Sequence, residues 1–180
     1  MYEKVVTALI NGVVDAPQRI GTIDLKPFLK QIDRLAPQLR ARRLDMFAEG
    51  LQDWIGVTEA DLFGGRHRPE GLQGQCSVDA LVQCDNCTPA AQIAGRVWKH
   101  GNIVPKTLVI VDSTGVVRGV ARSAPISPFI NRTFYLSKFT ANIGFLGYIR
   151  DYNPQLKYAV RSADGVLSDE KIPVQIAIQK

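Results

Sequence analysis

The sequence predicts an α+β protein in which a helical N-terminal region, residues 1–65, precedes an antiparallel β-sandwich of about seven strands, residues 76–180. Apolar residues between positions 25 and 35 recur with the helical period, and helix caps and stops follow up to position 64, which together predict the first part. Short β-rich runs at regular spacing predict the second. The intervening segment 66–75 is rich in glycine and has no apolar period, so it is predicted to be a loop or linker.

Three helices are expected in the N-terminal region. The first begins at Asp24, a suitable N-cap, and ends or kinks at Pro37. The second spans residues 39–49 and stops at Gly50, because glycine tolerates the left-handed conformation that closes a helix. The third is short: Thr58 to Asp61 has the spacing of a capping box, and this helix is expected to end near Gly64.

Seven β-rich runs follow, separated by proline and glycine. The clearest pair is Thr107–Asp112 and Val116–Arg122, joined by Asp112-Ser113-Thr114-Gly115, which predicts a β-hairpin. Prolines fall between the runs or at their edges, where a strand tolerates them. The expected strands are 77–83, 90–98, 107–112, 116–122, 143–149, 156–162 and 172–178. Most aromatic residues in them, Trp98 among them, are expected to fill the sandwich core.

Composition excludes several classes of protein. With 46% apolar and 22% charged residues among 180, the chain resembles an ordinary globular protein. No apolar run approaches the roughly 18 residues that a membrane-spanning helix requires. Met1 is not followed by a signal peptide, although the chain can also be a domain of a longer protein. Arg34, Arg40, Arg42 and Arg43 suggest a nucleic-acid or anionic-lipid binder, but the net charge of +5 is modest, so no nucleic-acid partner is expected.

The three cysteines, Cys76, Cys84 and Cys87, are the first candidates for chemistry. Zinc needs about four ligands, and His67 and His100 do not stand at the spacing of a zinc finger. Cys84 and Cys87 lie between two predicted strands, whereas a redox Cys-x-x-Cys normally opens a helix. We find no hydrolase, metalloprotease or phosphate-binding signature. The sequence therefore predicts no catalytic residue, metal or cofactor, and an enzyme using Cys84 or Cys87 is the alternative.

The β half resembles a soluble C-terminal module of bacterial polytopic inner-membrane proteins of the cell envelope, several of them glycan-related. The resemblance rests on Cys76, then Ile93–Trp98, then Val109–Asp112, then Arg118–Ser123, and later Gly144–Tyr148. Arg43–Phe47, Asp53–Gly56 and Leu62–Gly64 also resemble the region before that module. Cys84-Asp85-Asn86-Cys87 departs from the pattern, so no cysteine pairing is carried over from the family.

The resemblance implies a non-catalytic domain outside the cytoplasm, in the periplasm, beside the membrane-embedded part of its parent protein. We expect it to bind glycan or protein partners of the cell envelope. In that compartment a structural disulfide is expected, and Cys76–Cys87 is favoured over Cys84–Cys87 because it would staple a hairpin. Tyr152, in the polar turn Asp151–Pro154, is the aromatic residue expected to be exposed and to contact a ligand.

Overall fold

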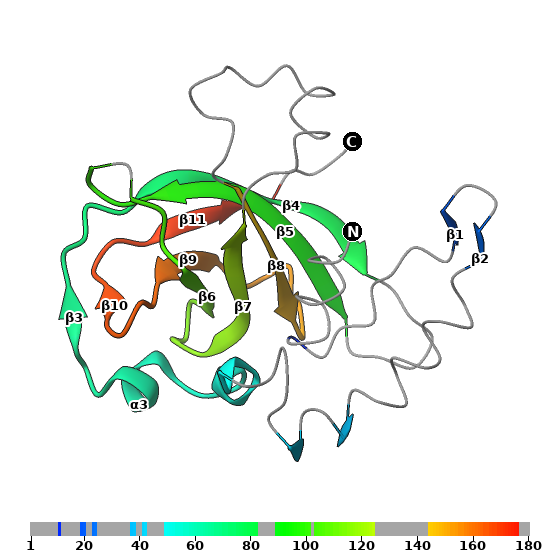
Figure 1. Cartoon of the computed structure of the whole chain (residues 1–180), viewed down its shortest axis with the longest axis horizontal. Helices are drawn as coiled ribbons and strands as arrows, with labels where there is room; N and C mark the ends of the chain where they lie inside the picture. The colour runs from blue at the N-terminus through cyan, green and yellow to red at the C-terminus, as the bar shows by residue number, and fades with distance from the viewer. Residues whose placement is uncertain are drawn as a thin grey trace.

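The structure is a computed structural model (Figure 1) that describes residues 11, 19–20, 23–24, 37–38, 41–42, 49–82, 89–101, 103–124 and 144–176. Of these residues, 52% are in strands and 11% in helices. Seven strands close into one β-barrel. The predicted fold class, a helical region followed by a β-sandwich, is therefore wrong.

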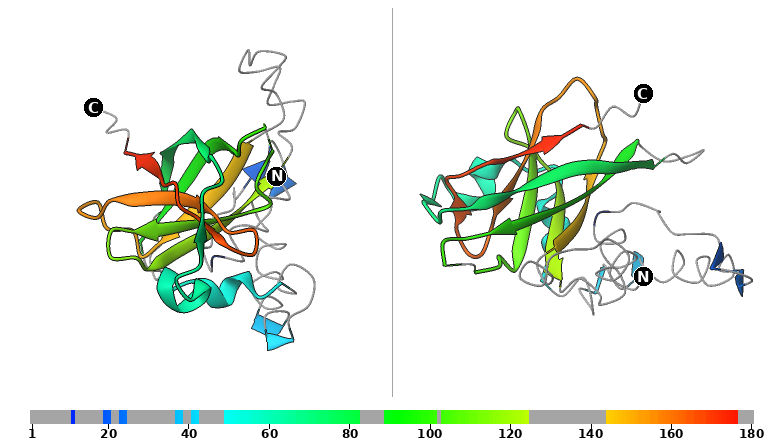
Figure 2. Two further views of the ribbon diagram at one scale, coloured as in Figure 1. Left: turned by 90° about the vertical axis from the view of Figure 1, so that its left-hand side faces the viewer. Right: turned by 90° about the horizontal axis from the view of Figure 1, so that it is seen from above.

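The barrel consists of seven strands in the spatial order β11-β4-β5-β8-β7-β6-β9 (Figure 1). All neighbours are antiparallel except β11 and β4, which run parallel and join the end of the chain to the start of the barrel. Strands β4 and β5 are the longest and lie side by side across the barrel (Figure 2). The strands are β4 (Gln73–Val82), β5 (Ala90–Trp98), β6 (Thr107–Asp112), β7 (Val117–Ala124), β8 (Gly144–Arg150), β9 (Tyr158–Ser162) and β11 (Ile172–Gln175).

Each of these strands overlaps one of the seven predicted runs, and the β6–β7 hairpin forms as predicted. The difference from the predicted sandwich is that the strands close into a barrel. β11 pairs with β9 through Ile172 and Val160 on one side, and with β4 through Val174 and Cys76 on the other. A sandwich and a barrel share the same alternation of inward and outward residues, so strand periodicity does not distinguish them.

Two glycines allow β4 and β5 to pack closely over the core. Gly74 has a φ of +150°, and a Cβ there would lie 2.1 Å from the carbonyl oxygen of Arg96. Gly95 faces Cys76 across the pair, and a Cβ on it would lie 2.6 Å from the Cys76 Cβ. A side chain at either position would push the strands apart, so these glycines allow β4 and β5 to pair closely.

Apolar side chains fill both faces of part of the barrel wall. Inside lie residues such as Ile93, Leu108, Ile110 and Ile149. Outside, Val109 and Val111 of β6 join a second cluster with Leu51 and Phe63. That cluster is covered by the 3₁₀ helix η2 (Leu51–Trp54) and the short helix α3 (Glu59–Phe63), which lie beneath the barrel in Figure 1.

The N-terminal region has little of the predicted helix in its described residues. Asp24, predicted to be an N-cap, lies instead in the two-stranded pair β1 (Arg19–Ile20) and β2 (Ile23–Asp24). One helical hydrogen bond joins the Arg42 amide to the Gln38 carbonyl, 3.1 Å. Most of the first two predicted helices lies outside the described residues.

The third predicted helix is confirmed as α3. The Thr58 side chain accepts a hydrogen bond from the Asp61 amide, 3.1 Å, and Gly64 closes the helix in the left-handed conformation. The predicted linker 66–75 is partly ordered into strands. It contributes β3 (His67–Arg68), which pairs in parallel with β10 (Leu167–Ser168), and the first residues of β4.

Asn11, far from the barrel in sequence, is fully buried against β7. Its side-chain amide donates to the Val120 carbonyl, and its carbonyl accepts from the Val120 amide, both at 2.8 Å. Asn11 thus satisfies the two backbone groups of Val120 as a neighbouring strand would.

Candidate binding face on strands β4 and β5

Three clusters of charged groups in the described residues are bonded within the protein, in contrast to the exposed surface of β4 and β5. The first surrounds Arg161 of β9, whose side chain is 3% exposed. Its Nη1 donates to Glu59 Oε2 at 2.8 Å, and its other nitrogens donate to the Ser168 carbonyl and to His67 Nδ1. A guanidinium has only donors, so this His67 nitrogen is the acceptor. The cluster ties α3, β3, β9 and β10 together.

The second cluster joins the loops at one end of the barrel. Lys99 forms ion pairs with Glu70 and Asp164, both at 2.9 Å. Burial alone would lower the pKa of Lys99, but hydrogen bonds to these two carboxylates outweigh it and raise that pKa. For Glu70, burial acts to raise the pKa, and bonds from Arg68 and Lys99 outweigh it, so the pKa is lowered. Both groups are therefore held in their charged forms.

The third cluster closes the β6–β7 hairpin. The Asp112 carboxylate accepts bonds from the Thr114 amide at 2.8 Å and from Arg118 Nε at 2.7 Å. Burial acts to raise the pKa of Asp112, but the bonds from Thr114, Arg118 and the Val116 amide outweigh it and lower the pKa. In all three clusters the charged groups have partners within the protein, so their role is to stabilise the folded state.

Of the predicted cysteine sites, the structure describes only Cys76. It is a buried free thiol whose Sγ faces the Pro173 carbonyl oxygen at 3.4 Å, and burial raises its pKa to about 12. Such a thiol is unreactive. The Cys76–Cys87 disulfide is not present at Cys76, whose thiol is free. Cys84 and Cys87 lie outside the described residues, so the cysteine-based site stays a prediction.

Tyr152, predicted to be exposed, is partly buried. Its ring stacks on Tyr158 with a centroid distance of 5.6 Å and packs against the barrel core. The Tyr158 hydroxyl in turn bonds to the backbone of Asn153. Tyr152 therefore has a packing role in the fold, and its predicted contact with a ligand is untested.

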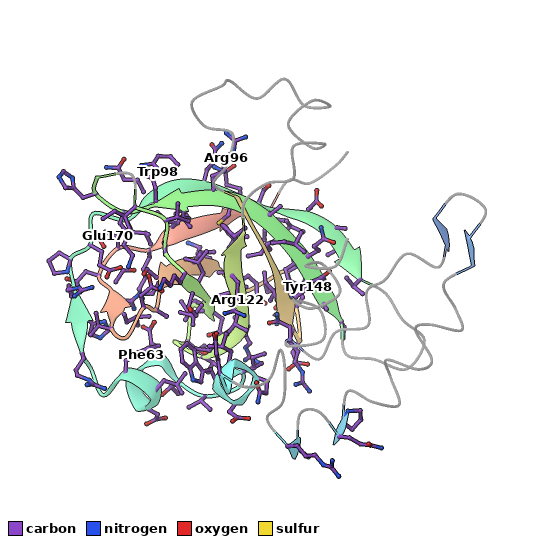
Figure 3. The ribbon with its side chains drawn as sticks, in the orientation of Figure 1. Phe63, Arg96, Trp98, Arg122, Tyr148 and Glu170 are labelled. Atoms are coloured by element: carbon purple, nitrogen blue, oxygen red, sulfur yellow. The ribbon has the colours of Figure 1, made fainter. Side chains whose placement is uncertain are left out.

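A different surface presents polar and aromatic groups to solvent, which we call the β4–β5 outer face. It consists of Gln73, Gln75 and Ser77 of β4 with Arg96 and Trp98 of β5. Their neighbours Cys76 and Val97 point into the core, and side chains alternate along a strand, so these five point outward. Figure 3 shows Arg96 and Trp98 on the outer side of β5.

The register places these side chains in opposed pairs. Gln73 lies opposite Trp98, and Gln75 lies opposite Arg96. Directly opposed residues have Cβ atoms about 5 Å apart, and Arg96 and Trp98 are separated by about 6–7 Å along the strand. Both glutamines are exposed, while Arg96 and Trp98 are half-buried. An indole, a guanidinium and two amides thus share one small surface.

Charge on this surface is unbalanced. Among the described residues, Arg96 has no ion-pair partner, unlike Arg68, Arg118, Arg122 and Arg161. The outward positions of β4 and β5 between 73–77 and 94–98 carry no carboxylate. Asp79, further along β4, accepts a bond from Gln92 Nε2 at 2.7 Å. The face therefore presents one uncompensated positive charge beside neutral hydrogen-bonding groups.

Sequence reasoning missed this face because it assigned Trp98 to the core. The signal that could have found it is polar residues at every second position, Gln73, Gln75 and Ser77, opposite Arg96 and Trp98. Among the described residues, no group of His, Cys, Asp and Glu side chains is arranged to hold a metal ion. The helices in that part of the chain are all too short or too polar to span a membrane.

The chain was compared with protein-family models, curated proteins and solved structures, and none of them matches. The resemblance to a module of inner-membrane proteins accordingly stays a prediction. Function has to be inferred from the geometry of the site.

Proposed function

We propose that this chain is a non-catalytic binding domain that holds a glycan on the β4–β5 outer face. The observation that carries the proposal is the placement of Trp98 beside Gln73, Gln75 and Arg96 on an open, outward-facing strand pair. An indole ring packs against the apolar face of a sugar ring. Amide side chains both donate and accept hydrogen bonds, as sugar hydroxyls do.

A glycan suits this face better than a protein partner does. Stable protein interfaces bury about 800 Å² on each side around an apolar, aromatic-rich centre. Here the aromatic group is a single half-buried tryptophan, and its neighbours are amides, a hydroxyl and a guanidinium. A narrow aromatic platform edged with hydrogen-bonding groups fits one or two sugar rings.

The proposal also places the domain outside the cytoplasm, in a larger bacterial membrane protein. Support for this comes from the resemblance carried by Ile93–Trp98, Val109–Asp112 and Arg118–Ser123. The glycan-related members of that group agree with the sugar-binding character of the outer face. A reporter that is active only after export, inserted beside this domain in the full-length parent protein, tests the location in cells.

The binding proposal is tested by native affinity electrophoresis in gels that contain neutral or acidic polysaccharides. Wild-type protein should be retarded by at least one of them, and Trp98→Ala should weaken the affinity about tenfold, because the stacking surface is lost. Leu81→Ala is the matched control, because Leu81 is an exposed apolar residue of β4 outside the face. Equal retardation of wild type and Trp98→Ala, or no retardation by any polysaccharide, would contradict the proposal.

A further inference from the structure

We infer that the glycan held by this face is acidic and that Arg96 binds its carboxylate. This inference rests on the proposed function and adds the chemical class of the ligand. It begins from the partners of the other arginines. Of the eight arginines whose side chains the structure describes, Arg68, Arg118, Arg122 and Arg161 each have a carboxylate within 2.8 Å. The other four, Arg42, Arg66, Arg96 and Arg150, have none among the described residues. What distinguishes Arg96 from the other three is its place beside the outward-facing Trp98 on one strand.

Arg96 is also half-buried, which makes an unpaired charge there unfavourable. Part of its hydration is replaced by protein, and no carboxylate of the described residues compensates it. An anionic ligand would supply the missing partner. A guanidinium is suited to this because its planar fork donates two parallel hydrogen bonds to one carboxylate.

The neighbouring residues favour a carboxylate attached to a sugar over a free anion. Trp98 lies two residues from Arg96 on the same face, about 6–7 Å away along the strand. A sugar ring stacked on Trp98 would therefore bring a carboxylate on that ring or the next one to Arg96. Gln75, opposite Arg96, is placed to bond the hydroxyls beside it.

The face is built on a firm support, as a selective site requires. β5 is paired with β4 along the whole face, including Arg96 with Gln75 and Trp98 with Gln73, and with β8 as far as Gly95. Beneath it, Val97 and Ile93 are fully buried. Arg96 and Trp98 therefore project from a central strand of the barrel, with their spacing fixed by the backbone.

The test uses one acidic polysaccharide, polygalacturonate, and the same polymer after chemical reduction of its carboxylates to alcohols. Binding is measured by isothermal titration calorimetry with wild type, Arg96→Ala, Arg96→Lys and the charge-matched control Arg150→Ala. Wild type and Arg150→Ala should bind the acidic polymer equally. Arg96→Ala should bind it about 10- to 100-fold more weakly, and Arg96→Lys should be intermediate, because a lysine keeps the charge and loses the fork.

The outcomes separate this inference from the proposed function. If wild type bound the acidic and the reduced polymer with equal affinity, and Trp98→Ala still weakened that binding, the inference that Arg96 binds a carboxylate would be wrong and the proposed glycan binding would stand. Binding to dextran sulfate without binding to polygalacturonate would also overturn it, since the anion would then be a sulfate. No binding to any of these polymers would remove the support for both, and capture of a purified envelope protein through Arg96 would replace them with a protein partner.

Discussion

The interior charged clusters and the β4–β5 outer face use similar residues in opposite ways. Arg161 is bonded by groups from other elements of the chain, and Asp112 is bonded by residues of its own hairpin. On the outer face, Arg96 has no described ion-pair partner and Gln73 and Gln75 face solvent. Polar groups that have hydrogen-bond or ion-pair partners within the protein stabilise the fold, and polar groups that lack such partners are available to a ligand. The comparison therefore separates residues that stabilise from residues that bind.

The largest expected effect comes from breaking the Arg161 cluster. Arg161→Ala leaves Glu59 and the Ser168 carbonyl without their partner, and loss of one member of a buried ion pair lowers the free energy of unfolding by about 3–5 kcal/mol. Urea denaturation followed by tryptophan fluorescence measures it. Arg96→Ala, the same substitution on the outer face, should lie within about 0.5 kcal/mol of wild type. Equal losses in the two variants would remove the distinction between the regions.

A second, pH-dependent effect should come from Asp112. Its folded pKa is lowered, so its contribution to stability is present above its usual pKa, 3.8, and is lost as the pH falls from there through the folded value. Asp112→Asn should lower the free energy of unfolding at pH 7 by about 1.5–3 kcal/mol, because charge-assisted bonds from Arg118 and Thr114 are weakened.

This difference between wild type and Asp112→Asn should narrow in denaturation curves recorded below about pH 4, since wild-type Asp112 is then becoming protonated. A gap that stays constant from pH 7 to pH 3 would show that the charge of Asp112 does not matter.

A smaller loss is expected at Asn11. Asn11→Ala removes both bonds to Val120 and leaves its buried amide and carbonyl unpaired, which costs about 1–3 kcal/mol. Hydrogen exchange at the Val120 amide, followed by NMR, should accelerate with the same substitution. Unchanged exchange at Val120 would mean that Asn11 does not protect it.

The smallest effect concerns reactivity rather than stability. Cys76 is buried and its pKa is raised to about 12, so it should resist iodoacetamide at pH 8 in the native protein and react after unfolding in urea. Peptide mapping by mass spectrometry identifies the modified cysteine. Rapid alkylation of native Cys76, or its recovery in a disulfide with Cys87, would contradict the free buried thiol.

The sequence predicted the strands well and the architecture poorly, for physical reasons. Strand periodicity, turn residues such as Asp112 and Gly115, and the Thr58 cap act locally, and they produced the observed β6–β7 hairpin and α3. Closure depends on pairing Cys76 with Val174 across almost the whole barrel domain. Since each partner there is an ordinary strand residue, nothing local distinguishes a barrel from a sandwich.

The candidate site was missed for a related reason. Trp98 ends a predicted strand, where an aromatic ring was expected to fill the core, and only the alternation fixed by Val97 and Cys76 shows that it points outward. The error at Tyr152 was the reverse, because this residue was predicted to be exposed and is partly buried. It sits in a polar turn, but its ring stacks on Tyr158, a contact that turn composition does not reveal. In both cases the neighbours in space, rather than in sequence, decided exposure.

The most direct test of the division between the two regions is a ¹H–¹⁵N NMR titration of the wild-type protein with an oligogalacturonate. We predict that the amide shifts change along residues 73–77 and 94–98 and at the Trp98 indole, and that those around Arg161 and Asp112 stay constant. Changes centred on the Arg161 or Asp112 cluster, or no changes on β4 and β5, would contradict the claim that the open groups of the outer face bind and the paired groups of the interior stabilise.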